Sequence, residues 1–396
     1  MSGSLLRRPG FRWLWLGQTL LFAGVQFWFV AVTWLMLQRT GSGTSLALVL
    51  MAAALPRGLL LLLGGVLSDR HPPRTLAVRA GWILAIATGV LTLLASRDAL
   101  NLGPVLALAA VFGAAEACLY PAALALLPRL LEDRHLGRAH AWLQGSEQIS
   151  NVAGPALAGL SLAVAGATAA LAFDTALLLL AVGCFVQVRP SLAAADTAPN
   201  GGLGQGLREG IAFAWGHGAI RTGLTLIAMI NLAVLGPVVI GVVELVTLRF
   251  GGGAASYGWL QAAYGVGALV GVGWAGRFGA IAHPGRALGW LSAGLGAGLL
   301  GLAVASQWWT AAALLAAMGI GGGLVGVLAT AWLQRETPAP LQGRVMALAM
   351  LAGVAFDPVS QALSGVLIDI SLPGLFLIAG VSLLLTVPFA LRSTRG

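Results

Sequence analysis

Long runs of apolar residues, separated by short polar breaks, follow one another along the whole chain. A helix needs about 20 predominantly apolar residues to cross the hydrocarbon core of a bilayer. The runs are continuously apolar, whereas the strands of a membrane barrel alternate apolar and polar residues. The pattern therefore predicts an all-α membrane protein with twelve transmembrane helices. The expected helices cover residues 11–37, 44–67, 74–95, 101–127, 139–163, 167–188, 219–246, 255–276, 285–305, 309–333, 344–369 and 372–391.

Composition agrees with this pattern. Of the 396 residues, 58% are hydrophobic and 9% are charged. Soluble domains carry about a quarter charged residues, so this chain cannot cover itself with a polar surface, and a bilayer is the solvent that tolerates it. The formal net charge of +9 is better explained by arginines beside spanning helices than by nucleic acid, which we do not expect as a partner.

The sequence does not contain the motifs that several kinds of site require. Cys118 and Cys184 both lie in apolar runs and form no pattern, so neither a metal site nor a disulfide framework is indicated. The G-x-x-x-x-G-K-[ST] pattern is absent and the chain has no lysine, which argues against ATP-driven transport by this chain alone. We expect no cofactor and no enzymatic activity.

The arginines indicate an orientation. With the N-terminus in the cytoplasm, 18 of the 22 arginines fall in cytoplasmic segments, three lie on the opposite side, and Arg57 lies within a span. Cytoplasmic loops collect positive charge, so the asymmetry supports an even number of helices with both termini in the cytoplasm. Arginine without lysine, with frequent Ala, Gly and Leu, indicates a GC-rich bacterial genome. We therefore expect a multi-pass protein of the bacterial cytoplasmic (inner) membrane.

The longest polar stretch, 189–209, is rich in Pro, Gly, Asn and Asp and is predicted to be a loop between helices six and seven. At the end of this stretch, Leu207, Ile211 and Trp215 follow one another at helical spacing. This stripe predicts a short amphipathic helix at the membrane interface. The expected organisation is a six-helix bundle at 1–188, a cytoplasmic linker with the amphipathic helix at 189–218, and a second six-helix bundle at 219–396.

An internal repeat supports two similar halves. The segments 127–142 and 333–348 match at an offset of 206 residues, with Arg138 corresponding to Arg344, and Gly159 and Gly365 keep the same offset. Matching loops after helices four and ten imply two six-helix halves in parallel orientation. Such a repeat is typical of one large class of secondary transporters.

The segment Gly64–Arg74, "GGVLSDRHPPR", lies at the cytoplasmic junction of helices two and three. It resembles the signature loop of the major facilitator superfamily, with Pro72 in place of the usual glycine. The matching residues of this gating motif include Gly65, Asp69, Arg70 and Arg74. The resemblance implies that the aspartate approaches the N-terminus of helix eleven, favoured by the helix dipole, and closes the cytoplasmic side. A simple charged anchor is the alternative.

The segment Ser150–Gly159, "SNVAGPALAG", resembles the superfamily's antiporter-associated motif at Gly154, Pro155 and Gly159. That likeness implies efflux, although small residues also serve ordinary helix packing. The stretches 333–348 and 207–215 resemble an efflux branch that includes enterobactin exporters and macrolide efflux pumps. The resemblance implies a monomeric secondary transporter that exports an amphiphilic small molecule, with protons as the coupling ion.

Charged residues at membrane depth are costly and are candidates for function. Arg57 and Asp357 each lie about 13 residues into helices two and eleven, roughly 20 Å deep at 1.5 Å per residue. The resembled fold makes these helices face each other, so we hypothesise that the two side chains approach each other or share a cavity.

Helices four and five carry the remaining candidates for substrate or proton coupling. Glu116 and Glu147 lie on consecutive helices, and two nearby carboxylates in a low dielectric would suit a proton carrier. A hydrogen-bonded structural pair is the equal alternative. Gln144, Gln148 and Asn151 share one face with Glu147 at i, i+3, i+4, i+7 spacing. A polar stripe of this kind is expected to face a cavity.

Two features limit the analogy with drug–proton antiporters. Helix one has no acidic residue, and helix four lacks the arginine often found in proton-coupled members. Asp174, in a peripheral helix, is expected to be structural, whereas Trp28 and Phe29 are candidates for stacking on a substrate. The alternatives are an importer or facilitator of a small metabolite or lipid in the same fold, and a non-transporting sensor or assembly partner.

Overall fold

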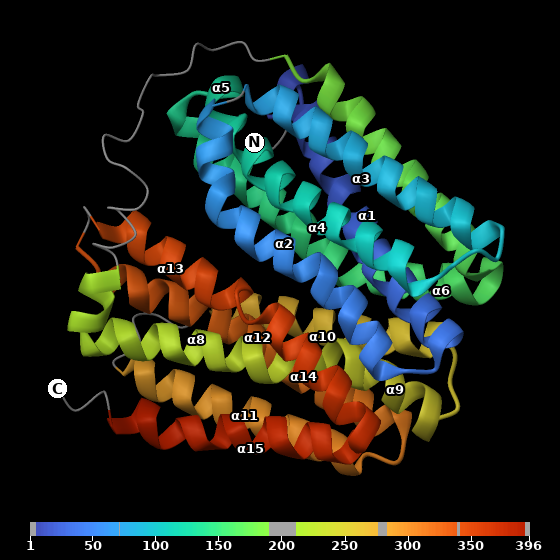
Figure 1. The fold of residues 1–396 in the computed structure, drawn as a ribbon. Coiled ribbons are helices and arrows are strands. Elements are labelled where there is room, and N and C mark those ends of the chain that lie inside the picture. Colours follow the sequence, from blue (N-terminus) through green and yellow to red (C-terminus); the bar gives the residue numbers. More distant parts are fainter. Residues whose placement is uncertain (1–4, 71, 190–210, 276–282, 339–340, 393–396) are drawn as a thin grey trace. The chain divides into compact units, whose positions relative to one another are not determined.

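The computed structural model describes residues 5–70, 72–189, 211–275, 283–338 and 341–392, and no strand occurs among them. Side chains at 61–70 and at a few isolated helical positions lie outside the description. The first half contains six helical elements (Figure 1). They are α1 (Pro9–Thr40), α2 (Gly43–Arg70), α3 (Pro73–Ser96), α4 (Leu102–Ala125), α5 (Leu127–Leu130) and α6 (Asp133–Gln187).

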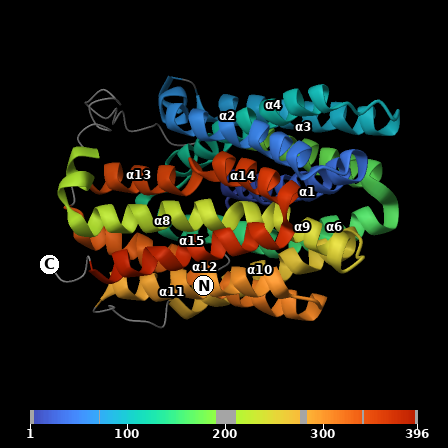
Figure 2. The same ribbon diagram turned by 60° about the horizontal axis from the view of Figure 1, so that its bottom comes forward.

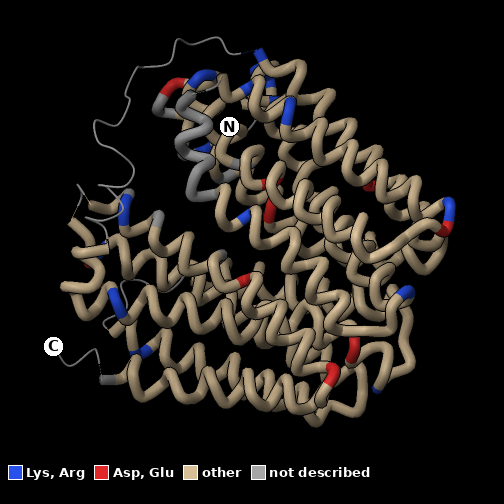
Figure 3. The backbone as a smooth tube through the Cα atoms, viewed as in Figure 1, with Lys and Arg blue, Asp and Glu red and all other residues tan. Residues whose placement is uncertain are grey.

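The second half begins with α8 (Gly218–Gly236), which continues through two π-helical turns to residue 249. These turns are η2 (Pro237–Gly241) and η3 (Leu245–Arg249), with α9 (Val242–Glu244) between them. The later helices are α10 (Ala254–Ala275), α11 (Pro284–Val304), α12 (Trp308–Glu336), α13 (Gln342–Val354), α14 (Asp357–Ile370) and α15 (Leu372–Arg392). Figure 3 shows that the charged positions lie mostly towards the ends of these helices.

Ten helices of the described chain are long and apolar enough to cross a membrane. That number treats α6 as one span and omits α10. However, α6 has 55 residues, and Gly166 interrupts it with φ 80° and ψ 172°, a conformation essentially restricted to glycine. The break falls between the predicted helices 139–163 and 167–188. Counting both parts of α6 and the 22-residue α10 gives the twelve predicted spans.

One predicted helix is confirmed as a single span, Arg344–Ile370, but is interrupted within it. The expected continuous helix 344–369 is divided into α13 and α14 by residues 355 and 356. Pro358, in the first turn of α14, has no backbone N–H and cannot continue the hydrogen-bond ladder from α13. The break places Asp357 in the first turn of a half-helix, which the apolar pattern alone did not indicate.

The chain forms two compact units. Unit 1 comprises Met1–Gln38 and Ala52–Pro199, and unit 2 comprises Arg39–Met51 and Asn200–Gly396. Within unit 1, α3 packs on both α4 and α6. Within unit 2, α10 packs on α12 and α11 packs on α15, as Figures 1 and 2 show for the second pair.

The first turns of α2 belong to unit 2 because they pack tightly on α14. A Cβ atom added to Gly365 would lie 2.2 Å from the Cβ of Ala47, so this contact requires a glycine. Beside it, the Thr44 hydroxyl donates a hydrogen bond to the carboxylate of Asp369. The segment 39–51 therefore makes specific contacts with α14 and α2 contributes to both units.

The start of unit 2 includes part of the expected amphipathic helix. Residues 211–216 are helical, whereas Leu207 lies outside the described residues. Trp215 is 66% exposed, and Ala214 is buried in a cluster with Ile220 and Leu333. One side of this short helix thus faces the bundle and the other faces outward, as an interfacial helix requires.

Candidate transport site

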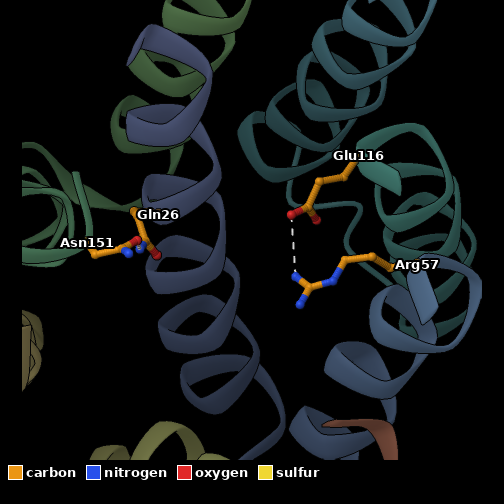
Figure 4. A network of polar contacts seen from close by, with 4 residues as sticks. All are labelled: Gln26, Arg57, Glu116 and Asn151. Carbon is orange, nitrogen blue, oxygen red and sulfur yellow. Dashed lines mark hydrogen bonds and ion pairs between the residues drawn. The ribbon is translucent and has the colours of Figure 1, made fainter. Parts of the chain in front are cut away.

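An ion pair lies inside unit 1 between α2 and α4. The Nη1 atom of Arg57 is 3.4 Å from Oε1 of Glu116, and the two side chains point towards each other (Figure 4). Their side chains are 24% and 19% exposed. Charge at membrane depth is tolerated when it is paired, so each residue compensates the other.

A close helix crossing positions this pair. A Cβ atom on Gly113 would lie 1.9 Å from the carbonyl oxygen of Ala53, so α2 and α4 are almost in backbone contact there. Arg57 follows Ala53 by four residues, and Glu116 follows Gly113 by three. Residues three or four apart share a helix face, so the crossing brings both charges to the same side one turn later.

The polar stripe of α6 faces α1 and α4. Glu147 and Gln144 line a cavity of about 40 Å³ together with Gln18 and His140. Gln18 is 1% exposed, and among the described residues neither atom of its amide has a hydrogen-bond partner. A buried amide without partners is costly, and a cavity of this volume has room for on the order of two waters.

Further along the stripe, α1 and α6 are joined directly. The amide of Gln26 donates a hydrogen bond to the side-chain oxygen of Asn151 (Figure 4). A Cβ atom on Gly154 would lie 2.6 Å from the Cβ of Gln26, so the glycine allows the close approach. Pro155 and Gly159 are also buried. Within unit 1, the antiporter-like motif thus packs α6 against α1.

The predicted coupling residues therefore divide into separate groups. Glu116 contacts Arg57, whereas Glu147 lies beside Gln18, so the described contacts do not join the two carboxylates to each other. Asp357 belongs to unit 2 and Arg57 to unit 1. Their approach to each other stays a prediction.

In unit 2, α14 carries a buried polar stripe that sequence reasoning missed. Asp357, Ser360, Gln361 and Ser364 are all at most 6% exposed. They follow the same i, i+3, i+4, i+7 spacing as the stripe on α6, which could have revealed them. The stripe meets α8, where the Gly236 N–H donates to the Ser360 hydroxyl over 2.8 Å.

The π-helical turn η2 lies beside this contact and receives hydrogen bonds from α10. Gln261 donates through Nε2 to the Val238 carbonyl, and the Tyr257 hydroxyl donates to the Val239 carbonyl, each over 3.2 Å. Irregular backbone within a membrane needs internal partners. These bonds therefore stabilise a distortion of a kind that often marks functional sites.

The gating motif is described only in part. Gly65, Asp69 and Arg70 fall in α2, but their side chains lie outside the described residues. Arg74 donates to the Val186 carbonyl over 2.5 Å, near the C-terminal end of α6. A cation there satisfies a carbonyl that has no partner within its helix.

Two further residues lie in the core of unit 1. Trp28 is 1% exposed and stacks on Phe112, with ring centroids 4.2 Å apart, so in this structure its ring serves packing rather than an open surface. Asp174 is fully buried, and Gly24 makes room for it on α1. Among the described residues its carboxyl oxygens have no hydrogen-bond partner.

Comparison with known proteins identifies the relatives of this chain. It is 27% identical over 161 residues to macrolide efflux protein A of Streptococcus pyogenes, covering 41% of this chain and 40% of that protein. It is 29% identical over 222 residues to the multidrug efflux pump Tap of Mycobacterium tuberculosis, covering 52% and 50%. The chain thus spans about half or less of the length of these curated relatives.

Solved structures share the fold. The nucleoside transporter NupG superposes with a TM-score of 0.79 at 12% identity, covering 97% of this chain and all of that chain. A transporter of the POT family in complex with a thioalcohol-conjugated peptide superposes with a TM-score of 0.77 at 10% identity, covering 97% and 95%. The profile of a family described as transmembrane secretion effector matches residues 2–394. The chain therefore belongs to this transporter family of the major facilitator superfamily, as a multi-pass membrane protein and not an enzyme.

Proposed function

We propose that the protein exports an amphiphilic small molecule from the bacterial cytoplasm in exchange for protons. Its relatives are named for efflux of macrolides and of multiple drugs. The chain acts as a monomer in the inner membrane, with both termini in the cytoplasm. Alternating access comes from two six-helix bundles, 1–188 and 219–396, joined by the linker 189–218.

The observation that supports proton exchange most directly is the cavity between Glu147 and Gln18. Glu147 is partly buried, and the described residues that line the cavity include His140 but no arginine. A carboxyl without a permanently charged arginine beside it can bind and release a proton without breaking such an ion pair. Water in the cavity satisfies the Gln18 amide and conducts the proton to Glu147.

Arg57 and Glu116 form the second part of the proposed mechanism. A cationic group on the substrate competes with Arg57 for Glu116 and opens the pair. Breaking an ion pair in a partly buried site is costly, so binding and pair opening are coupled. Gln144, Gln148 and Asn151 supply neutral hydrogen-bonding groups along the same route.

In unit 2, Asp357 completes the proposed set. It lies in the first turn of a half-helix, a position that interrupted helices in transporters use for substrates and coupling ions. Gly65, Asp69, Arg70 and Arg74 form the proposed cytoplasmic gate, and Gly154, Pro155 and Gly159 allow α6 to move on α1.

The proposal is tested in proteoliposomes with a radiolabelled macrolide and an imposed pH gradient. Glu147→Gln should abolish gradient-driven transport but retain exchange of labelled for unlabelled macrolide at equal pH, because exchange needs no net proton movement. Glu132→Gln is the control, since Glu132 lies outside the spans with a 52% exposed side chain.

Three other results would contradict the proposal. Net movement of macrolide down its own gradient in the unmodified protein, without proton movement and without any effect of the imposed pH gradient, indicates a facilitator. Proton and macrolide movement in the same direction indicates an importer. Unchanged gradient-driven transport in Glu147→Gln removes this residue from the mechanism.

A further inference from the structure

Unit 2 contains a crevice of about 400 Å³ between α11 and α12. Its lining comes wholly from these two helices and is almost entirely apolar. The lining includes Trp290, Gly294 and Gly298 of α11. It also includes Met318, Gly321 and Leu324 of α12. Both helices belong to the spans long and apolar enough to cross a membrane, so this crevice lies at membrane depth.

Small residues create the crevice. A Cβ atom on Gly298 would lie 2.4 Å from the Met318 side chain, so the two helices touch there. Four residues earlier on the same face of α11, Gly294 has no atom within 4 Å of its would-be Cβ. The helices are therefore in contact at Gly298, while the side-chain space around Gly294 is empty.

The crevice opens outward rather than into a closed core. Trp290 is 64% exposed, and Gly294, Ala297 and Ala317 are exposed as well. An apolar hollow of this volume is unfavourable when filled with water, because its walls offer no hydrogen bonds. At membrane depth its natural occupant is hydrocarbon.

Cations mark one end of the crevice. Arg286 precedes Trp290 by four residues and Gly294 by eight, so all three share one face of α11 and Arg286 lies about 12 Å beyond Gly294 along the axis. On α12, Arg335 follows Leu324 by eleven residues, about three turns, and lies about 16 Å further on. Both arginines are exposed.

The two arginines lie at the same side of the membrane. They stand near the first residue of α11 and the last residue of α12, which are consecutive spans. Arg286 is also in the first turn of α11, where the helix dipole favours an anion. Trp290 lies between Arg286 and the hollow, at the depth where tryptophan prefers the headgroup boundary.

We propose that this crevice is a binding site for one glycerophospholipid of the bilayer. An acyl chain occupies the hollow at Gly294, and Arg286 binds the phosphate, with Arg335 adding positive charge. Arginine recognises phosphate through two parallel N–H donors. Charge at one end and hydrocarbon space beyond it match a phospholipid better than a neutral drug, and the site is independent of the exported substrate.

The test counts phospholipid molecules retained by the purified full chain in mild detergent, by native mass spectrometry. The unmodified protein should retain one phospholipid that Gly294→Leu loses, because the leucine would occupy the hollow, where an added Cβ has no atom within 4 Å. Arg286→Gln should weaken retention about tenfold and affect phosphatidylglycerol far more than diacylglycerol, which lacks the phosphate. Gly183→Leu is the control, since Gly183 is also exposed with nothing near its would-be Cβ.

Equal retention in the unmodified protein, Gly294→Leu and Gly183→Leu would overturn the proposal. Equal binding of phosphatidylglycerol and diacylglycerol would overturn the role of Arg286. Displacement of the bound molecule by a macrolide, but not by added phospholipid, would assign the crevice to substrate instead. Arg286→Gln keeps the test valid if Gly294→Leu fails to fold, since Arg286 is exposed.

Discussion

At the scale of single residues, Gly113 determines where the Arg57–Glu116 pair forms. The helices α2 and α4 can approach to backbone contact only because this position has no side chain. Both charges then lie one turn beyond the crossing, 3.4 Å apart. Adding one methyl group at Gly113 should therefore affect both the packing of α2 on α4 and the Arg57–Glu116 ion pair.

Gly113→Ala is expected to destabilise the protein by about 1–3 kcal/mol, the usual cost of overpacking. The added Cβ would meet the Ala53 carbonyl at 1.9 Å, so the helices must separate. Thermal unfolding in detergent measures the change. Gly103→Ala is the control on the same helix, because Gly103 has open space around it. Equal stability of the two variants would show that α2 and α4 are not held this closely.

The sequence predicted the candidate residues better than their partners. Arg57, Glu116 and Glu147 could be found because charges in apolar runs are rare. Gln18 could not be found in this way, because it is uncharged and nothing in a single sequence shows that it shares a cavity with Glu147. Which side chains pair between helices depends on where the helices cross, as at Gly113. In the sequence alone, a glycine at such a crossing cannot be told apart from the other glycines.

At the scale of elements, the apolar runs predicted the twelve spans but not every break within them. The interruption at Gly166 coincides with a predicted boundary, whereas the one before Asp357 does not. Likewise, the π-helical turns in the span that begins at α8 leave an ordinary apolar pattern. The first of them, η2, receives hydrogen bonds from Gln261 and Tyr257, which are tertiary contacts.

Gly166→Ala tests the break within α6. Its φ of 80° and ψ of 172° are essentially restricted to glycine, so alanine should cost about 1–3 kcal/mol of stability. No atom lies within 4 Å of the would-be Cβ, so backbone strain is the only penalty. Gly183→Ala, in the regular part of α6, should be neutral or slightly stabilising. Thermal unfolding of both variants separates backbone strain at residue 166 from a general effect of alanine in a helix. A Gly166→Ala variant with the stability of the unmodified protein would argue against the break in α6.

At the scale of the whole molecule, α2 has a special position because residues 39–51 belong to unit 2 and the remainder to unit 1. The attachment to α14 includes Gly43 against the Ile368 side chain, Ala47 against Gly365, and a hydrogen bond from Thr44 to Asp369. Alternating access requires contacts that form and break during each cycle. This attachment is therefore a place where the proposed cycle can be tested directly.

A disulfide at this attachment should stop transport. In the variant Thr44→Cys with Asp369→Cys, oxidation would tie the first turn of α2 to α14, and we expect transport in proteoliposomes to fall to the background level. Reduction should restore it, because the side chains already meet in the unmodified protein. Each single cysteine variant is the control for loss of the hydrogen bond alone. Full transport by the oxidised double variant, with the crosslink verified by mass spectrometry, would mean that α2 and α14 stay together throughout the cycle.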